Sequence, residues 1–338
     1  MKKLICLLII QSFNHSIIQS SCSAQNLGGQ RAFSFLNLPT NAHLNALGGI
    51  STSTSNDVSS FWASPALLDS VQRNQTALTL SPYLAGALLS TVSYGLPTQK
   101  RWAIGLQYLH YATLPLTDPA GNETGTFSAA DYALALSHAR TEGNITAGMT
   151  LKMVGSGIES YQSWAVVADL AAVFKHPKND FTFGLAVKNA GMFLKRYSPT
   201  DASELPFDVQ VGATFKPRFM PLRFSITAQQ VYQWDIVYND PAINFSFDTN
   251  GNVITRKPST VEKLARHLVF GTELLLHKNF RLLLGYNHLR RQEMRLQKGG
   301  GAAGFSFGLM AQTSRFGFGY SYAVQHVAGG LHAISFRF

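Results

Sequence analysis

The chain ends in Leu331-His-Ala-Ile-Ser-Phe-Arg-Phe338, a stretch in which large apolar and polar side chains alternate. In an extended strand, Ile334, Phe336 and Phe338 fall on one face and the residues between them fall on the other. A strand with one apolar face is the unit from which bacterial outer-membrane barrels are built. The terminal stretch therefore predicts an all-β barrel, and we interpret Phe336 and Phe338 as its C-terminal insertion signal.

The same alternation recurs through most of the sequence. In residues 102–108, tryptophan, isoleucine, leucine and tyrosine alternate with alanine, glycine and glutamine. The second face is generally small, which suits a lumen better than the charged outer face of a soluble sandwich. Fourteen segments follow the pattern and predict a 14-stranded antiparallel transmembrane outer-membrane β-barrel over residues 73–338. The predicted strands are 75–82, 87–96, 102–112, 130–140, 145–156, 163–175, 181–192, 206–216, 222–234, 266–276, 280–289, 302–312, 315–325 and 331–338.

Connections between the predicted strands alternate in length. The short connections lie at 97–101, 141–144, 177–180, 217–221, 277–279 and 313–314. The long connections lie at 113–129, 193–205, 235–265 and 290–301. Short periplasmic turns and long outer loops are the rule for bacterial barrels. We therefore expect both termini in the periplasm and the long loops outside the cell.

The first 24 residues are typical of a secretory signal peptide. Two lysines precede a short apolar run, and the small residues that follow predict cleavage after Ala24. Lipid attachment at Cys22 is a weaker alternative, since Gln19 is a poor residue three positions before the cysteine. Both cysteines, Cys6 and Cys22, lie in this segment. The mature chain would therefore have no disulfide and no thiolate metal site.

The composition also fits a membrane barrel. Charged residues make up 14% of the chain, below the roughly 25% of soluble domains. No apolar run reaches about 18 residues, so we expect no transmembrane helix. The formal net charge is +10, but lysine and arginine are scattered rather than gathered on one face. This pattern argues against nucleic-acid binding, whereas the positive excess would also suit contact with anionic lipopolysaccharide.

Residues 25–72 do not follow the strand pattern. They are too apolar for a solvated tail, because they include Phe33, Phe35, Phe61 and Trp62. Fourteen strands enclose more space than the side chains of the wall fill. We therefore expect this segment to fold into or under the barrel as a plug.

Three motifs in that segment resemble the N-terminal signature of the FadL-like outer-membrane barrels. They are Ala46-Leu47-Gly48-Gly49, Asp57-Val58 and Ser64-Pro65-Ala66-Leu67-Leu68. The resemblance implies fourteen strands and a plug with an Asn-Pro-Ala turn. Here Ser64 replaces the asparagine, and since either side chain can bond the following backbone, we expect the turn to be kept. The plug motif implied for this chain is Ala46, Leu47, Gly48, Gly49, Asp57, Ser64, Pro65 and Ala66.

Within that superfamily, Gly28-Gly29-Gln30 and Phe33-Ser-Phe35-Leu36-Asn37-Leu38-Pro39 are similar to the PorQ family of the type IX secretion system of Bacteroidota. This resemblance implies a component of the complex that removes the sorting signal of secreted proteins and links them to lipopolysaccharide. It implies the surface protein PorZ as a partner and, through it, the protease PorU and the barrel PorV. The candidate contact residues on the long loops are Tyr197, Asp201, Asp240, Phe245, Asp248 and Asn250.

Two local motifs match chemical sites without the context that the chemistry needs. Gly304-Phe-Ser306-Phe-Gly308 matches a hydrolase nucleophile elbow, which requires a strand-to-helix turn, whereas Ser306 falls within a predicted strand. The stretch that starts at Asp248 resembles a calcium loop, but its sixth position is Val253 instead of glycine. An Asn-Gly hairpin explains it better. The histidines show no metal-binding spacing. We predict no catalytic residue, no cofactor and no metal site.

Eight charged residues fall on the predicted inner face. A charge in a narrow lumen needs a partner or water, so we interpret them as ion pairs within the lumen or with the plug, although they could also line a permeation path. They are Lys152, Asp169, Lys188, Asp208, Arg223, Glu273, Arg281 and Arg337.

Three functions remain open from the sequence. The first is a non-enzymatic scaffold of a surface complex. The second is a FadL-like channel for hydrophobic molecules, which would need an apolar pocket where this lumen is small and polar. The third is a membrane lipase that uses Ser306, and it has the least support.

Overall fold

The computed structural model falls into two units, Gly28–Trp234 with Ser259–Phe338, and Met1–Leu27 with Asp235–Pro258. In the second unit, strands β10 (Phe245–Phe247) and β11 (Val253–Thr255) pair antiparallel. The predicted signal peptide, Cys6, Cys22, Gly28, Gly29, Asp240, Asp248 and Asn250 lie outside the described residues. The structure describes residues 30–69, 72–98, 100–237, 245–247, 253–255, 259–294, 301–326 and 329–338.

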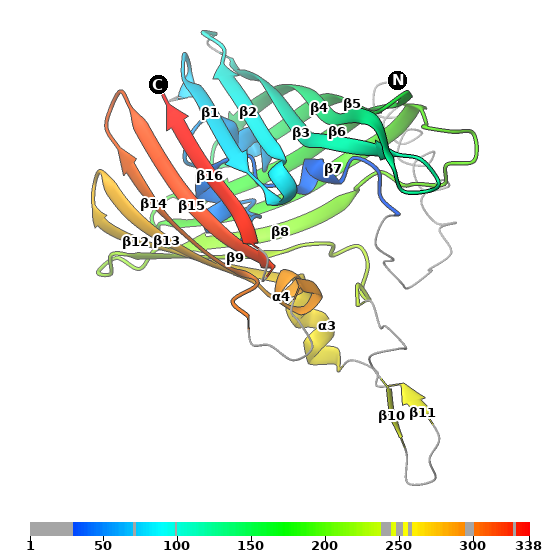
Figure 1. Cartoon of the computed structure of the whole chain (residues 1–338). Helices are drawn as coiled ribbons and strands as arrows, with labels where there is room; N and C mark the ends of the chain where they lie inside the picture. Colours follow the sequence, from blue (N-terminus) through cyan, green and yellow to red (C-terminus); the bar gives the residue numbers. More distant parts are fainter. Residues whose placement is uncertain are drawn as a thin grey trace, which may run out of the picture. The chain divides into compact units, whose positions relative to one another are not determined.

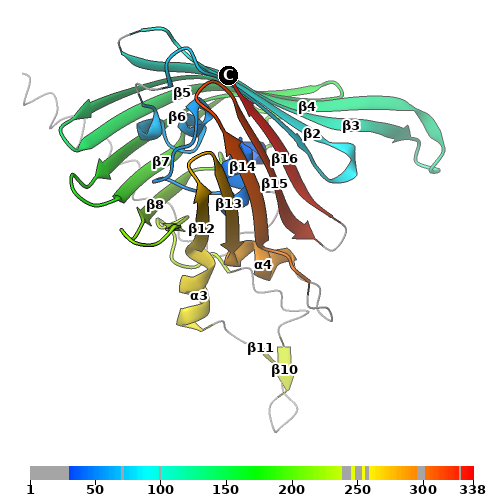
Figure 2. The same cartoon turned by 90° about the vertical axis from the view of Figure 1, so that its left-hand side faces the viewer.

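Fourteen strands of the first unit form one closed antiparallel barrel (Figures 1 and 2). Strands adjacent in the chain are neighbours in the sheet, with β9 next to β12 and β1 next to β16. The predicted fold class is confirmed. The strands are β1 (Thr76–Pro82), β2 (Leu88–Gly95), β3 (Arg101–Thr117), β4 (Glu123–Glu142), β5 (Ile145–Ile158), β6 (Tyr161–Lys175), β7 (Phe181–Lys195), β8 (Asp208–Phe215), β9 (Leu222–Ala228), β12 (Leu268–His277), β13 (Phe280–Asn287), β14 (Phe305–Gln312), β15 (Gly317–His326) and β16 (Gly329–Arg337).

The C-terminal stretch closes the barrel. Leu78 lies opposite Phe336 in the β1–β16 ladder. Beyond the ladder, the backbone N–H of Phe338 donates to Thr76 O at 2.9 Å, and the N–H of Thr76 donates to Phe338 O at 3.1 Å. The ring of Phe338 packs 5.6 Å from that of Phe316. This pairing leaves the sheet without a free edge.

Apolar side chains face outward and polar side chains face inward. Leu134 and Met149 are 58% and 48% exposed, whereas Lys152 and Asp169 are 1% and 0% exposed. Such a distribution is the reverse of that in a soluble barrel. Hydrocarbon is the solvent that accepts an apolar outer face, so the wall is that of an outer-membrane barrel.

Two sequence predictions about the wall are wrong. Most of the predicted loop 113–129 is an extension of the β3–β4 hairpin, in which Leu114 pairs with Phe127 and only residues 118–122 connect the strands. The predicted strand 222–234 ends at Ala228, because the backbone leaves the extended region at Gln230, whose φ is 52°.

Residues 30–69 lie inside the barrel (Figure 1). Their side chains bond strands far apart in the ring: Ser53 Oγ lies 2.7 Å from Thr214 Oγ1 of β8, and Trp62 Nε1 donates to Ser93 Oγ of β2 at 3.0 Å. A segment can contact strands so far apart in the ring only from inside the barrel. We call residues 30–69 the inner segment. Its helices are η1 (Ser34–Asn37), α2 (Ala42–Ala46), η2 (Val58–Trp62) and η3 (Pro65–Leu67).

The remaining short helices lie in connections between strands. They are η5 (Leu84–Gly86), α3 (Thr260–His267) and α4 (His288–Met294). No helix in the described part of the chain is both long and apolar enough to cross a membrane.

Glycines on the inner face of the wall make room for the inner segment. A Cβ added to Gly285 would lie 2.3 Å from the backbone N of Gly48, and one added to Gly184 would lie 2.2 Å from Thr52 O. Such distances are far below van der Waals contact, and the backbone of a docked segment cannot move aside cheaply. The small inner face that predicted a roomy lumen is therefore a docking surface for the inner segment.

We expect Gly285→Ala to loosen the inner segment and to lower the free energy of unfolding by about 1–3 kcal/mol, because its methyl group overlaps the Gly48 backbone. Gly157→Ala is the matched control, since no atom lies within 4 Å of the Cβ it would add. Thermal unfolding of the purified barrels in detergent measures both. Equal melting temperatures for the two variants would contradict the docking role of Gly285.

Candidate functional site: the lumen cavity and the loop rim

The first plug motif forms a helix end that docks on β13 and β14. Helix α2 is followed by Gly48 and Gly49, whose φ values of 93° and 95° suit glycine alone. Ser306 Oγ donates to Ala46 O at 2.9 Å, and Asn287 Nδ2 donates to Gly48 O at 3.2 Å. The hydroxyl of Ser306 thus holds the inner segment, and the elbow-like sequence around it lies in a strand.

The other two plug motifs also stabilise local structure. Asp57 begins η2, where its carboxylate accepts the N–H of Ser59 at 2.9 Å. The predicted turn at Ser64 forms through the backbone, with Leu67 N–H donating to Ser64 O at 3.0 Å. The expected side-chain bond is not made, because Ser64 Oγ has no hydrogen-bond partner in the described chain. Pro65 at the first helical position fixes φ and keeps the turn without it.

Glu273 is the centre of a buried charge cluster. Its carboxylate lies 3.5 Å from Nε2 of His43, 3.6 Å from Nη1 of Arg223 and 3.3 Å from Nη1 of Arg281. His43 belongs to the inner segment and the two arginines belong to β9 and β13. The cluster therefore brings a residue of the inner segment into contact with the ion pairs of the wall.

The remaining inward charges also have partners. Lys152 Nζ lies 2.5 Å from Asp169 Oδ2 and donates to Asn189 Oδ1 at 3.0 Å. The predicted ion pairs are present for Lys152, Asp169, Arg223, Glu273 and Arg281, whereas the other three inward charges make hydrogen bonds to uncharged groups. The other contacts are Lys188 Nζ to Trp62 O at 3.0 Å, Gln210 Nε2 and the N–H of Gln230 to Asp208 at 2.6 Å each, and Arg337 Nη2 to Thr313 O at 2.8 Å.

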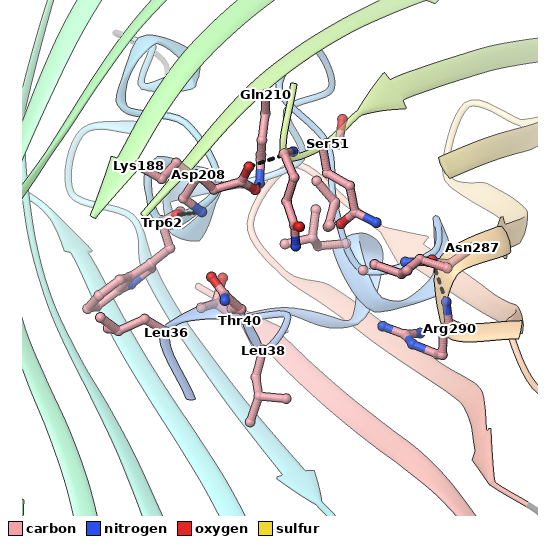
Figure 3. Close-up of a pocket in the computed structure, with 18 of the residues that line it drawn as sticks. Leu36, Leu38, Thr40, Ser51, Trp62, Lys188, Asp208, Gln210, Asn287 and Arg290 are labelled. Carbon is pink, nitrogen blue, oxygen red and sulfur yellow. Dashed lines mark hydrogen bonds between the residues drawn. The ribbon is translucent and has the colours of Figure 1, made fainter. Parts of the chain in front are cut away.

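A cavity of about 210 Å³ lies between the inner segment and the wall (Figure 3). Leu36 and Leu38 give it an apolar side, and Lys188 and Asp208 give it a polar one. Residues that follow β9 and residues of α4 also line it. Its lining is mixed, unlike the apolar pocket that the channel hypothesis requires.

Two of the predicted contact residues make hydrogen bonds within the protein. Tyr197 Oη donates to Ser156 Oγ of β5, and Asp201 Oδ1 accepts the N–H of Ser203 in its own loop at 2.9 Å. Hydrogen bonds from Ser203 lower the pKa of the Asp201 carboxyl. The role of Tyr197 and Asp201 as partner contacts stays a prediction. Phe245 lies in β10 of the second unit.

A group of exposed apolar residues, which the sequence analysis did not single out as contacts, lies on and beside α3. Val261 and Leu264 are 76% and 48% exposed, one turn apart on the helix, and Trp234 is 58% exposed. His267 at the end of α3 holds Trp234, with ring centroids 6.4 Å apart. We call Trp234, Val261 and Leu264 the rim patch. The spacing of Val261 and Leu264, three residues apart, is a sequence signal for this patch. It lies inside a segment that the sequence predicted as a loop.

Helix α3 is tied to α4. Glu262 Oε2 lies 3.2 Å from His288 Nε2, and Arg266 Nε donates to Glu262 Oε1 at 3.1 Å. Burial raises the pKa of the Glu262 carboxyl, but the hydrogen bonds from His288 and Arg266 together outweigh it and leave this pKa lowered. Because α4 follows β13 directly, these bonds fix α3 to the end of the wall.

Comparisons with known proteins support the fold. No protein-family profile and no curated protein matches the sequence. Among solved structures, the chain is similar to the Ralstonia pickettii toluene transporter TbuX, with a TM-score of 0.53, 11% identity, and coverage of 90% of this chain and 99% of that chain. It also matches the TodX monoaromatic hydrocarbon channel deltaS2 mutant (TM-score 0.48, 12% identity, 88% and 96% covered) and a Pseudomonas aeruginosa FadL homologue (0.47, 11%, 88% and 98%).

The protein is thus a 14-stranded outer-membrane barrel whose fold is similar to that of TbuX. At an identity of 11%, the likeness to TbuX shows the fold and nothing about substrate. Among the described residues, no group of three or more His, Cys, Asp or Glu side chains could hold a metal ion.

We expect Glu273→Ala to lower the free energy of unfolding by about 3 kcal/mol, because Arg223 and Arg281 lose their shared anion inside the barrel. Asp180→Ala is the control, since Asp180 pairs with Arg223 at 3.5 Å with half of its side chain exposed. That variant should change stability by less than about 1 kcal/mol. Urea titration of the barrels in lipid vesicles distinguishes the two, and similar losses would contradict a central role for Glu273.

Proposed function

We propose that the protein is a non-enzymatic outer-membrane anchor for a soluble surface protein. The observation that carries this proposal is the inner segment, which fills the lumen and bonds strands around the ring. A barrel closed in this way offers a fixed platform instead of an open pore. The contact of His43 with Glu273 and the hydrogen bonds that Lys188 and Ser306 donate hold that platform to the wall, as an attachment point requires.

The proposed contact surface is the rim patch. Exposed tryptophan and leucine outside the strands are the residue types that anchor protein interfaces when a partner buries them. The bonds of Glu262 to Arg266 and His288 hold α3 in place before any partner arrives, which lowers the entropy lost on binding. In this proposal the long loops face the cell exterior and the termini face the periplasm.

The resemblance of the N-terminal stretch to the PorQ family supports a specific partner. In this proposal the protein holds a PorZ-type surface protein within the attachment complex of the type IX secretion system, beside PorU and PorV. Lipopolysaccharide and outer-membrane lipid would then surround the wall. Division of the chain into signal peptide (1–24), plug (25–72) and barrel (73–338) belongs to the same proposal.

The second candidate is a channel for hydrophobic small molecules. The likeness to the toluene transporter TbuX favours it, because the match covers 99% of that chain. The cavity lining opposes it, since Lys188, Asp208 and Arg290 share the space with the leucines. A hydrophobic solute would leave these polar groups without water.

We expect Val261→Glu with Leu264→Glu to weaken binding of a purified PorZ-type protein at least tenfold, because both side chains are exposed apolar anchors. Phe219→Glu is the control: Phe219 is 98% exposed in the turn between β8 and β9. Surface plasmon resonance on the detergent-solubilised barrel measures all three proteins. Deletion of residues 240–260 tests the loop itself. Unchanged binding by both the double variant and the deletion would refute the anchor surface.

Uptake of labelled toluene and of a labelled fatty acid separates the two candidates. For an anchor, cells that lack the protein should take up both compounds at the rate of the parent strain. A severalfold fall in uptake, restored by the intact gene, would favour the channel. The double variant in the rim patch serves as control, since it should leave any transport unchanged.

A further inference from the structure

Three residues that line the cavity each carry a buried polar atom without a hydrogen-bond partner in the described chain. The atoms are Thr40 Oγ1, Gln229 Nε2 and Arg290 Nη1. Thr40 and Gln229 are 4% and 5% exposed. The amide and guanidinium nitrogens can only donate, and the hydroxyl can donate as well. Because buried donors in proteins nearly always have acceptors, the matching occupant of this cavity presents oxygen atoms.

The charged residues that line the cavity favour an occupant whose oxygen atoms carry negative charge. Asp208, one anion of the lining, already accepts bonds from Gln210 and from the N–H of Gln230. Glu293, the other, is buried, and this burial raises the pKa of its carboxyl, while the charges of Arg266 and Arg290 lower it. Burial also lowers the pKa of the Arg290 guanidinium, a cost that an anion beside Nη1 would offset.

The guanidinium of Arg290 is held in place by the plug motif. A Cβ added to Gly49 would lie 2.9 Å from Nη2 of Arg290, so the missing side chain provides the space that the guanidinium occupies. The backbone N–H of Arg290 donates to Asn287 Oδ1 at 3.1 Å, and Figure 3 shows both residues at one side of the cavity. A positioned guanidinium with one unpartnered nitrogen suits an anionic oxygen.

Size limits the ligand. The volume of about 210 Å³ has room for a short acid or a single acidic side chain. Leu36 and Leu38 would pack against its few carbon atoms.

We propose that this cavity binds a carboxylate, with Arg290 Nη1, Gln229 Nε2 and Thr40 Oγ1 as donors. The carboxylate has two conceivable sources. One is a free short dicarboxylic acid, which is independent of the anchoring role. The other is an acidic side chain of the surface partner, which rests on the proposed function.

Isothermal titration calorimetry on the full-length barrel in detergent tests the proposal with two probes. Succinate represents the free acid, and N-acetyl-aspartate N-methylamide represents an acidic side chain in a peptide. Saturable binding of either probe supports the carboxylate site. Binding of succinate alone assigns the free acid, and binding of the aspartate probe alone assigns the partner. The matching asparagine amide should not bind, because it lacks the charge.

Variants locate the site. We expect Arg290→Gln to weaken binding at least tenfold and Thr40→Val, which is nearly isosteric, to weaken it about threefold. Arg218→Gln, at an exposed arginine in the turn after β8, should bind like the parent. Melting temperatures confirm that each barrel is folded. If neither probe binds the parent, or if Arg290→Gln and Thr40→Val both bind like the parent, the proposal is wrong and the cavity holds only water.

Discussion

Hydrocarbon cannot hydrogen-bond a backbone, and this constraint governs the rest of the structure. Every N–H and C=O of a membrane wall needs a partner within the protein, so a sheet must close on itself. Here the last contribution to closure comes from the pairing of Phe338 with Thr76 and of Phe336 with Leu78. Once the ring is closed, the same alternation that turns Leu134 to lipid turns small and polar side chains inward. The polar side chains that face the lumen then need hydrogen-bond partners inside the barrel.

The inner segment supplies those partners. Its helix α2 brings His43 to Glu273, and its turns bring backbone carbonyls to Ser306 and Lys188. The wall accommodates the segment through glycines whose added Cβ atoms would overlap its backbone. A buried charge cluster without this complement would be unfavourable, because an isolated buried carboxylate or guanidinium is costly. Wall and inner segment are therefore one folding unit, although their sequence patterns differ.

The sequence predicted the features that depend on periodicity. Alternation located all fourteen strands and both faces, and the inward charges were correctly interpreted as partnered. Periodicity failed to predict the features that depend on tertiary contacts. The β3–β4 extension contains proline and glycine, which read as loop, yet Leu114 and Phe127 pair there. Helix α3 turns Val261 and Leu264 outward, so no core-facing pattern marks it. The unpartnered donors of Thr40, Gln229 and Arg290 come from distant parts of the chain and meet only in the folded lumen.

The contacts of the inner segment on both sides of the β1–β16 seam bear on the order of assembly. Asn45 bonds Ser321 and the carbonyl of Leu331, while Trp62 bonds Ser93 beyond the seam. In a ribbon open at this seam, these positions would lie near opposite edges, so the segment can hold all of them at once only when the ring closes. Pairing of β16 with β1 would then enclose the inner segment. The step that completes the membrane wall is therefore also the step that fixes this segment in the lumen. Loss of the β1–β16 ladder would open the wall and release the inner segment at the same time.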